Sequence, residues 1–254
     1  MGIRRPRASC GILARSADLH SYPLMSKLPF DAVLFDCDGV LVDSELITNR
    51  VLSEMLDELG WRMSVEETMR IFIGKAVKDE APLIEAKTGV SITEEWLVQF
   101  RERRNVALER GLVAIEGALS AVETLHRELD GRIAVASGAD RFKVSMQLTK
   151  VGMIDYFDGR VFSGHEMAHT KPYPDVYLAA AKALGVDPAR CAIVEDTVTG
   201  ATAGVSAGAT VFGYSPHEEG HSEPQALRET GVVKVFRNMA DLPAVLALWQ
   251  SRAA

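Results

Sequence analysis

The sequence predicts an α/β protein in which an all-helical subdomain is inserted into a core built around a parallel β-sheet. Three observations predict this fold class. Short apolar runs alternate along the chain with segments of helix length, which is typical of a right-handed parallel sheet. Between the first and second apolar runs, residues 44–111 show helical periodicity only, and such an interval is far too long for a crossover loop. The 254 residues are 47% hydrophobic and 25% charged, as in folded proteins with a sizeable core.

Five apolar runs are predicted to form the strands, because short continuous apolar runs are typical of strands buried on both faces. They are residues 31–35, 132–136, 191–194, 209–212 and 232–236. The predicted helices of the core are residues 117–129, 140–150, 174–184, 198–208 and 241–250. Pro174 and Asp175 suit the first turn of a helix, and Gly185 suits its end. We therefore assign residues 29–43 and 112–254 to the core.

Residues 44–111 are predicted to form the inserted helical subdomain. Apolar residues recur three or four positions apart in the range 52–59, as on one face of a helix. Ser64-Val-Glu-Glu67 is predicted to be a capping box. Thr93 is predicted to cap a further helix.

The first residues of the chain differ in charge from the rest. Residues 1–24 carry four arginines and one aspartate, whereas the whole chain has a net charge of −7. No apolar stretch of about 7–15 residues follows the arginines, as a secretory signal would require. We expect residues 1–28 to be a disordered leader, with Met25 as a candidate natural first residue, and a transit peptide is the alternative.

Charge and hydropathy exclude several classes of partner. A net charge of −7 argues against binding to duplex nucleic acid, which needs clustered Lys and Arg. The longest apolar runs fall short of the roughly 20 residues of a membrane-spanning helix, so we expect no membrane association. Cys10, Cys37 and Cys191 form no closely spaced set, which argues against a disulfide framework and a zinc site. We expect a cytoplasmic protein that is a monomer or a weak dimer.

Two aspartates follow the first predicted strand. Asp36 and Asp38 stand where the strand ends, and Gly39 lets the chain turn. Ligands of open parallel sheets bind outside the carboxyl ends of the strands, so both carboxylates are expected at the natural site. An EF-hand calcium loop is excluded, because its twelfth position must be acidic and is Ile47 here. On this motif alone, the alternative that Asp36 merely caps the following turn stays open.

Polar residues also follow other predicted strands. Ser137-Gly138 ends one strand, Glu195-Asp196 ends another, and Lys171 stands just before a predicted helix. Four acids at one edge of a sheet are costly unless a cation neutralises them, and oxygen ligands suit Mg²⁺. Ser, Lys and backbone amides are the complementary set for a phosphate. The sequence therefore predicts that Mg²⁺ and a phosphate bind at the same edge.

Together these residues resemble the four motifs of the haloacid dehalogenase-like hydrolase superfamily, in its branch of phosphatases and β-phosphoglucomutase-like enzymes. The similar stretches are Asp36-Cys-Asp-Gly-Val-Leu-Val-Asp-Ser-Glu45, Ser137, Lys171-Pro172, and Glu195-Asp196 with Thr197 and Gly200. The resemblance covers residues 31–254. It implies a Rossmann-like core, and it implies that residues 44–111 are the helical cap of that family.

The resemblance also implies roles for the two aspartates of the first motif. Asp36 would be the nucleophile that takes up the phosphoryl group as an acyl phosphate. Asp38 would be the general acid, which protonates the leaving oxygen, and then the general base, which activates water. Such a division is chemically sound, because a covalent carboxylate intermediate splits one difficult step into two easier ones.

The remaining motif residues would bind the metal and the phosphate. The resemblance implies that Mg²⁺ is held by the Asp36 carboxylate, the Asp38 backbone carbonyl and Asp196, with Glu195 close by. It implies that Ser137, Gly138 and Lys171 hold the phosphoryl oxygens. Phosphoryl transfer depends mainly on such positioning and charge neutralisation.

Lys75 and Asn49 are the candidates for substrate contacts from the helical subdomain. Lys75 follows the apolar residues 69–73, in the part of the cap where related enzymes carry their specificity loop. Asn49 stands on the first helix of the cap, close to the first motif. A solvated surface is the alternative for both, as it is for Lys78 and Arg50.

Other reactive residue types carry weaker signals. Cys37 stands between the two aspartates without a base next to it in the sequence, so we expect its backbone amide to matter and its thiol not to. His217 and His221 have the spacing of a helical metal pair but lie in residues 215–224, which are predicted to be a surface loop. His165 and His169 stand near the third motif, where we expect them to face solvent, and a contact with the substrate is the alternative.

We predict a Mg²⁺-dependent phosphatase that acts on a small phosphorylated metabolite, a sugar phosphate or a sugar-acid phosphate. Residues 35–39, 43–45 and 114–118 are similar to a group of the family that hydrolyses 6-phosphogluconate. The alternative is a phosphosugar mutase of the β-phosphoglucomutase kind, but that group typically carries a His and then a Trp shortly after the first motif, and residues 45–52 contain neither. Asp38 counts against a dehalogenase, the helical subdomain against a phospho-receiver domain, and the complete motifs against an inactive binding protein.

Overall fold

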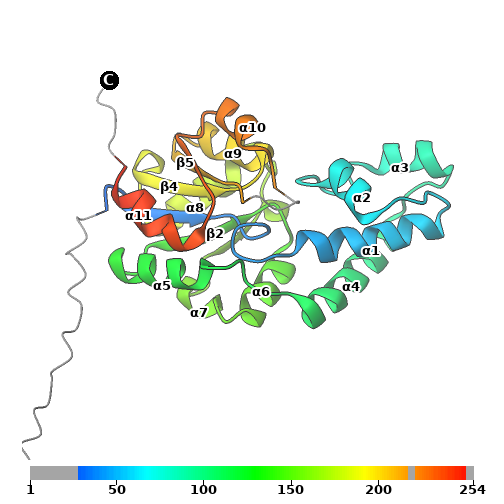
Figure 1. Ribbon diagram of the computed structural model, residues 1–254, viewed down its shortest axis with the longest axis horizontal. Helices are drawn as coiled ribbons and strands as arrows, with labels where there is room; N and C mark the ends of the chain where they lie inside the picture. The colour runs from blue at the N-terminus through cyan, green and yellow to red at the C-terminus, as the bar shows by residue number, and fades with distance from the viewer. Residues whose placement is uncertain (1–27, 217–220, 250–254) are drawn as a thin grey trace, which may run out of the picture.

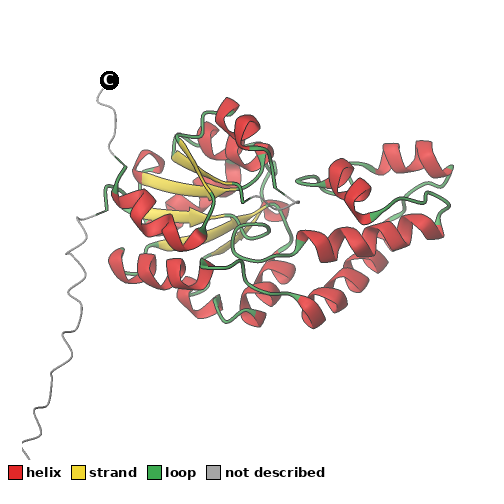
Figure 2. Ribbon diagram, viewed as in Figure 1, coloured by secondary structure: helices red, strands yellow, loops and turns green. Residues whose placement is uncertain are grey.

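The computed structural model describes residues 28–216 and 221–249 (Figure 1). The predicted leader, apart from Leu28, lies outside the described residues, as does His217. A sheet flanked by helices forms one part of the molecule, and four further helices extend from it to one side (Figures 1 and 2).

Within the described residues, six parallel strands form one sheet in the order β3-β2-β1-β4-β5-β6. The strands are β1 (Ala32–Phe35), β2 (Ile133–Ser137), β3 (Val161–Ser163), β4 (Cys191–Glu195), β5 (Thr210–Tyr214) and β6 (Lys234–Phe236). In the centre of the sheet, Phe35 pairs with Val135 on one side and with Val194 on the other. The predicted parallel α/β sheet is confirmed. Because the chain builds β2 and β3 on one side of β1 and β4 on the other, the topological switch point lies between β1 and β4.

Helices cover both faces of the sheet (Figure 1). One face packs against α5 (Ala118–Glu128), α6 (Arg141–Lys150), α7 (Ile154–Phe157) and α11 (Leu242–Ala247). The other face packs against α8 (Asp175–Leu184), α9 (Val198–Ser206) and α10 (Pro224–Glu229). Short 3₁₀ helices complete the core: η1 (Gly164–Glu166), η2 (Pro188–Arg190) and η3 (Met239–Asp241). In β1, Val33 and Phe35 enter the first cluster and Ala32 and Leu34 the second, which explains why the strand is apolar throughout.

Four helices occupy residues 45–111, and this fully described interval contains no strand. They are α1 (Glu45–Glu58), α2 (Val65–Phe72), α3 (Ala81–Thr88) and α4 (Glu94–Gly111). We call residues 45–111 the cap and the rest of the described chain the core. The cap has its own cluster of buried apolar residues, among them Leu52, Met55 and Phe100. The capping box at Ser64 is confirmed, and so is the cap at Thr93, which accepts a hydrogen bond from the Trp96 N–H.

Two segments that connect core and cap lie side by side. The Asp43 N–H donates to the carbonyl oxygen of Val113 at 3.0 Å, and Val42 forms an isolated bridge with Ala114. The segment that leaves the core and the segment that returns to it are therefore paired within the first motif, just before α1.

Several short elements of the core were not predicted. β3 has three residues, α7 four and α10 six. Unlike β6 and α11, which are as short, these elements do not lie within a longer apolar stretch that would reveal them. The predicted surface loop at 215–224 is partly wrong, because Ser215 is buried and Pro224 begins α10. Among the described residues, no helix combines the length and the apolar character that crossing a membrane requires.

Candidate active site

Asp36 lies at the carboxyl end of β1 and is 7% exposed. Its backbone N–H donates to the Val194 carbonyl oxygen at 3.0 Å, which extends the pairing of β1 with β4 by one residue. Lys171 Nζ donates to Asp36 Oδ1 at 2.8 Å and to Glu195 Oε1 at 2.6 Å. The lysine that precedes α8 thus joins the carboxylates that follow β1 and end β4.

In this group, the carboxylates of Asp36 and Glu195 share the single ammonium of Lys171. Burial raises the pKa of Asp36 to about 7, and Lys171, which acts in the opposite direction, offsets only part of that effect. Burial alone would lower the pKa of Lys171, but the carboxylates of Asp36 and Glu195 hold it above its ordinary value. The lysine therefore stays an ammonium, whereas Asp36 is poised between its neutral and charged forms near neutral pH.

Glu195 is fully buried, and both of its oxygens are engaged by the protein. Oε1 accepts from Lys171 and, at 2.5 Å, from the hydroxyl of Tyr177, whose ring also lies under the Lys171 ammonium at 4.8 Å. Oε2 accepts from the Asp196 N–H and from the Thr197 hydroxyl, each at 3.2 Å. A Cβ at Gly200 would lie 1.8 Å from Oε1, so only glycine fits against this carboxylate.

Asp196 is 1% exposed, and its Oδ1 has no hydrogen-bond partner among the described residues. Carboxylate oxygens of Asp36, Glu195 and Asp196 all lie within 4.8 Å of one another. Burial raises the pKa of Asp196 well above its ordinary value, and the charges of Glu195 and Asp36 raise it further. Three buried carboxylates beside a single ammonium and an unpaired carboxylate oxygen fit a hard divalent cation with oxygen ligands, such as Mg²⁺.

Gly39 allows the first motif to approach this cluster closely. Its φ is +74°, in the left-handed region, and a Cβ there would lie 2.2 Å from Asp196 Oδ2. His221 Nε2 lies 2.9 Å from the Gly39 carbonyl oxygen and 4.0 Å from Asp196 Oδ2. A histidine from the stretch predicted to be a surface loop is thus packed against the acidic cluster.

Asp38 has different partners from Asp36. Its Oδ1 accepts from Lys143 Nζ at 2.8 Å, from Gln147 Nε2 at 2.9 Å and from the Ser44 hydroxyl. Burial alone would raise the pKa of Asp38, but the Lys143 charge and these hydrogen bonds together lower it to about 2. The carboxylate of Asp38 is therefore held in its charged form.

Ser137 and Gly138 follow β2 on the other side of β1. Ser137 is 1% exposed, and its Oγ accepts the Ala139 N–H at 3.0 Å, which fixes the orientation of the hydroxyl. Both residues line the same cavity as Asp36, Asp38 and Lys171. The structure therefore brings the phosphate-binding candidates together with both aspartates.

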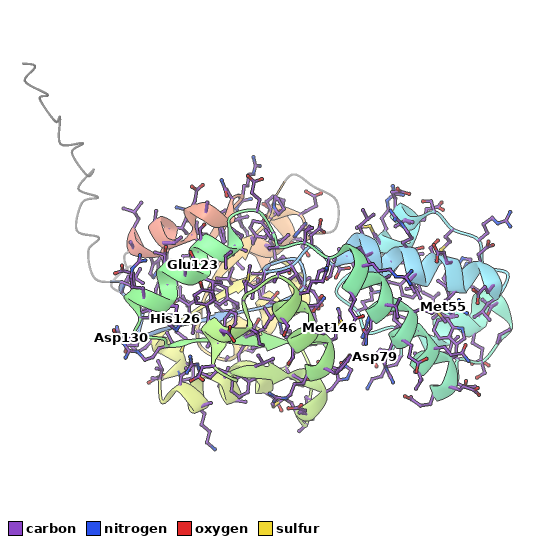
Figure 3. All side chains as sticks on the ribbon, turned by 90° about the horizontal axis from the view of Figure 1, so that it is seen from below. Met55, Asp79, Glu123, His126, Asp130 and Met146 are labelled. Atoms are coloured by element: carbon purple, nitrogen blue, oxygen red, sulfur yellow. The ribbon has the colours of Figure 1, made fainter. Side chains whose placement is uncertain are left out.

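A cavity of about 450 Å³ lies between the core and the cap. In Figure 3, the labelled Asp79, which lines it, lies in the cap toward the core, and the labelled Met146 lies in the core toward the cap. Lys75 and Asn49 also line the cavity. Lys75 is in an ion pair with Glu80 at 3.3 Å.

The amide of Asn49 has partners within its own helix. Its Nδ2 donates to Glu45 Oε2 at 3.0 Å, on a side chain that is only half-buried. Burial raises the pKa of Glu45 to about 7, and the charge of Asp38 adds to that rise. Asn49 is thus tied to an acid that also lines the cavity.

Sequence reasoning missed several residues of this site. Lys143 and Gln147 on α6 bind Asp38, Tyr177 on α8 binds Glu195, and Arg104 on α4 lines the cavity. The i, i+4 spacing of Lys143 and Gln147 is the one available signal for them, since it places both side chains on one face of a helix. Arg104 is 8% exposed and donates to Asp140 Oδ2 at 3.2 Å, which joins the cap to the start of α6.

Known proteins are similar to this chain in sequence and in fold. The family model of the haloacid dehalogenase-like hydrolases matches residues 30–208. The chain is 31% identical to the 6-phosphogluconate phosphatase of Escherichia coli K12 over 225 residues, which cover 87% of this chain and 96% of that protein. The crystal structure of a haloacid dehalogenase-like protein of unknown function from Agrobacterium tumefaciens has a TM-score of 0.74 at 33% identity, covering 86% of this chain and 98% of that one.

A second solved structure is that of a hydrolase from Deinococcus radiodurans with bound phosphate and sodium. It has a TM-score of 0.71 at 33% identity, and the match covers 87% of this chain and 96% of that one. The match to the family model spans well over half of the sequence, and the expected resemblance is confirmed. The chain belongs to the haloacid dehalogenase-like hydrolases.

Proposed function

We propose that the protein is a Mg²⁺-dependent phosphatase that hydrolyses a small phosphorylated metabolite through an aspartyl phosphate at Asp36. The observation that carries the proposal is the placement of Asp36. Its carboxylate stands at the sheet's switch point, lines the cavity and is bound by Lys171 at 2.8 Å. The Escherichia coli relative, a 6-phosphogluconate phosphatase, supports the same activity.

In the first half of the reaction, a carboxylate oxygen of Asp36 attacks phosphorus and the bond to the leaving oxygen breaks. The electron pair of that bond stays on the leaving oxygen, which takes a proton from Asp38 acting as general acid. Lys171, the Ser137 hydroxyl and the Gly138 N–H hold the phosphoryl oxygens and stabilise their charge. All five residues line the cavity.

In the second half, Asp38 acts as general base. It takes a proton from water, the resulting hydroxide attacks phosphorus, and the bond between Asp36 and phosphorus breaks. The low pKa of Asp38, about 2, suits the charged form that starts this half. For the first half, Asp38 must instead carry a proton. Oδ2 can carry it without loss of the bonds from Lys143 and Gln147, because both of these bonds are made to Oδ1.

Mg²⁺ would be held by the Asp36 and Asp196 carboxylates and the Asp38 backbone carbonyl. Glu195 would lie close to the ion without being one of these ligands. Its oxygens already accept hydrogen bonds from Lys171, Tyr177, Asp196 and Thr197. When bound, the ion would neutralise charge on the transferring phosphoryl group.

The substrate class we propose is a sugar phosphate or a sugar-acid phosphate such as 6-phosphogluconate. The relative that is a 6-phosphogluconate phosphatase supports a sugar-acid phosphate as the substrate. The cations of the cap that line the cavity support it as well. They are Lys75, Lys78, Arg101 and Arg104. A carboxylate far from the phosphate would meet them once the phosphate is bound at Lys171 and Ser137.

The proposal is tested by measuring phosphate release from 6-phosphogluconate, glucose 6-phosphate and p-nitrophenyl phosphate, with Mg²⁺ and with EDTA. We expect release that needs Mg²⁺ and is fastest with the sugar acid. Asp36→Asn is the matched control, since it keeps the shape of the side chain and removes the nucleophile. Turnover by Asp36→Asn at more than a few per cent of the wild-type rate would exclude the aspartyl phosphate. Conversion of glucose 1-phosphate to glucose 6-phosphate without phosphate release would indicate a mutase.

A further inference from the structure

Three hydrogen bonds converge on a single oxygen of Asp38. The donors are Lys143 Nζ at 2.8 Å, Gln147 Nε2 at 2.9 Å and the Ser44 hydroxyl, and all three bind Oδ1. None of these bonds is made to Oδ2. The carboxyl group is thus fixed through one oxygen, and the other remains for proton transfer in the cavity that Asp38 lines.

The start of α6 holds Lys143 in its buried position. Asp140 caps α6 by accepting the Lys143 N–H at 2.8 Å, which fixes the first turn of the helix. Lys143 is 6% exposed and Gln147 is completely buried, one turn further on the same face. Asp140 also binds Arg104 of the cap at 3.2 Å, so the start of α6 is held from both parts of the molecule.

Packing alone does not require a lysine at this position. Lysine is rarely buried, and a buried ion pair generally stabilises a fold no more than apolar side chains of the same volume would. The partner of the buried ammonium is Asp38, whose chemistry needs a defined orientation. The Lys143 side chain is therefore better explained by the orientation of Asp38 than by the stability of α6.

We propose that Lys143 is a positioning residue that, with Gln147, holds Asp38 through Oδ1 and directs its other oxygen at the leaving group and at the attacking water. This inference rests on the proposed phosphatase activity. Misplacing a reacting group by about 1 Å can cost about 10²-fold in rate. Lys143→Met, which keeps the length of the side chain and removes the ammonium, should therefore slow the steps in which Asp38 takes part.

The leaving group separates positioning from a structural role. p-Nitrophenolate leaves without a proton, whereas the oxygen of a hexose 6-phosphate needs one. We expect Lys143→Met to lower kcat/KM for glucose 6-phosphate or 6-phosphogluconate by about 10²-fold and for p-nitrophenyl phosphate by less than about tenfold. Lys150→Met, at the exposed end of the same helix, is the matched control and should change neither.

A double-mutant cycle tests whether Lys143 acts through Asp38. We expect Lys143→Met to have no further effect on kcat/KM in the Asp38→Asn background, because the group that it orients is then absent as an acid or base. Additive losses would overturn the proposal. So would an equal loss of kcat/KM for both kinds of substrate in the single variant.

A second substitution guards against misfolding of the first. Gln147→Met removes the other α6 donor to Asp38 and should show the same dependence on the leaving group to a smaller extent. Lys143→Arg keeps a positive charge and should retain part of the rate that Lys143→Met loses. An active wild type in which Lys143→Met and Gln147→Met behave like Lys150→Met would overturn this inference alone. A wild type that releases no phosphate from any of these substrates would overturn the proposed function, and this inference with it.

Discussion

The buried carboxyl group of Asp36 makes the stability of the metal-free protein depend on pH. Its pKa in the folded state is about 7, against an ordinary value of 3.8. The folded state therefore binds more protons than the unfolded state between these values. The stabilising contribution is complete below pH 3.8 and is lost as the pH rises through 7.

The size of this effect follows from the two pKa values. The difference between 3.8 and about 7 corresponds to roughly 4 kcal/mol in the free energy of unfolding, of which roughly 3 kcal/mol falls between pH 5 and pH 8. Asp36→Asn resembles the protonated acid and has no charge to lose. The substitution also removes the Asp36 charge that raises the pKa of Asp196. This further reduces the loss of stability that the variant suffers as the pH rises.

Urea unfolding in EDTA at pH 5 and pH 8 measures the difference. We expect Asp36→Asn to be more stable than the wild type at pH 8, and this advantage to shrink by roughly 3 kcal/mol at pH 5. Glu109→Gln, which removes an exposed carboxylate from α4, is the control and should follow the wild type. A free-energy difference between Asp36→Asn and the wild type that stays constant from pH 5 to pH 8 would refute the reasoning. Addition of Mg²⁺ at pH 8 should raise the stability of the wild type more than that of Asp36→Asn.

Four further substitutions test other parts of the site. Asp196→Ala should raise the Mg²⁺ concentration needed for half-maximal activity, and an unchanged metal titration would contradict its role as a ligand. Asp38→Asn should lower kcat by roughly 10²–10⁴ while acyl phosphate becomes detectable after rapid acid quench; a rate close to that of the wild type would contradict general acid–base catalysis. Tyr177→Phe leaves Glu195 with one donor fewer and should lower the free energy of unfolding by about 1–3 kcal/mol, as measured in urea, whereas an unchanged midpoint would show that the bond adds nothing. Lys75→Ala should lower kcat/KM for sugar-acid phosphates by a factor equivalent to about 1–3 kcal/mol and much less for neutral sugar phosphates, so equal losses on both would exclude Lys75 as the carboxylate site.

The core strands were predictable because burial on both faces leaves a continuous apolar run. β1, β2, β4 and β5 all have this pattern, with nearly every residue buried. β3 escaped prediction because it has three residues and one of them, Phe162, is only partly buried. α10 escaped because its six residues bury only Leu227, which gives no period to detect. β6 and α11 are just as short, yet both were predicted, because they lie within longer apolar stretches of the sequence.

The motif residues were predictable because each follows a strand or begins a helix at the same edge of the sheet. Asp36 follows β1, Ser137 is the last residue of β2, and Asp196 follows β4. Because these strands are parallel neighbours in the sheet, their carboxyl ends bring the three side chains together. Tyr177 was not predicted, because in sequence it is one more apolar residue on the buried face of α8. Its role comes from a hydroxyl that reaches Glu195, which no helical pattern encodes.

Asp36 and Asp38 stand two residues apart, yet their pKa values move in opposite directions. Each has its own lysine: Lys171, from the loop before α8, binds Asp36, and Lys143, from α6, binds Asp38. Lys171 also binds the carboxylate of Glu195, whose charge opposes that of the lysine at Asp36. Burial therefore outweighs Lys171, and the pKa of Asp36 is raised. Lys143 is assisted by neutral donors, so its charge acts on Asp38 undivided. A short acidic motif therefore predicts where the chemistry takes place, but the division of labour between its two acids depends on partners more than 100 residues away in the chain.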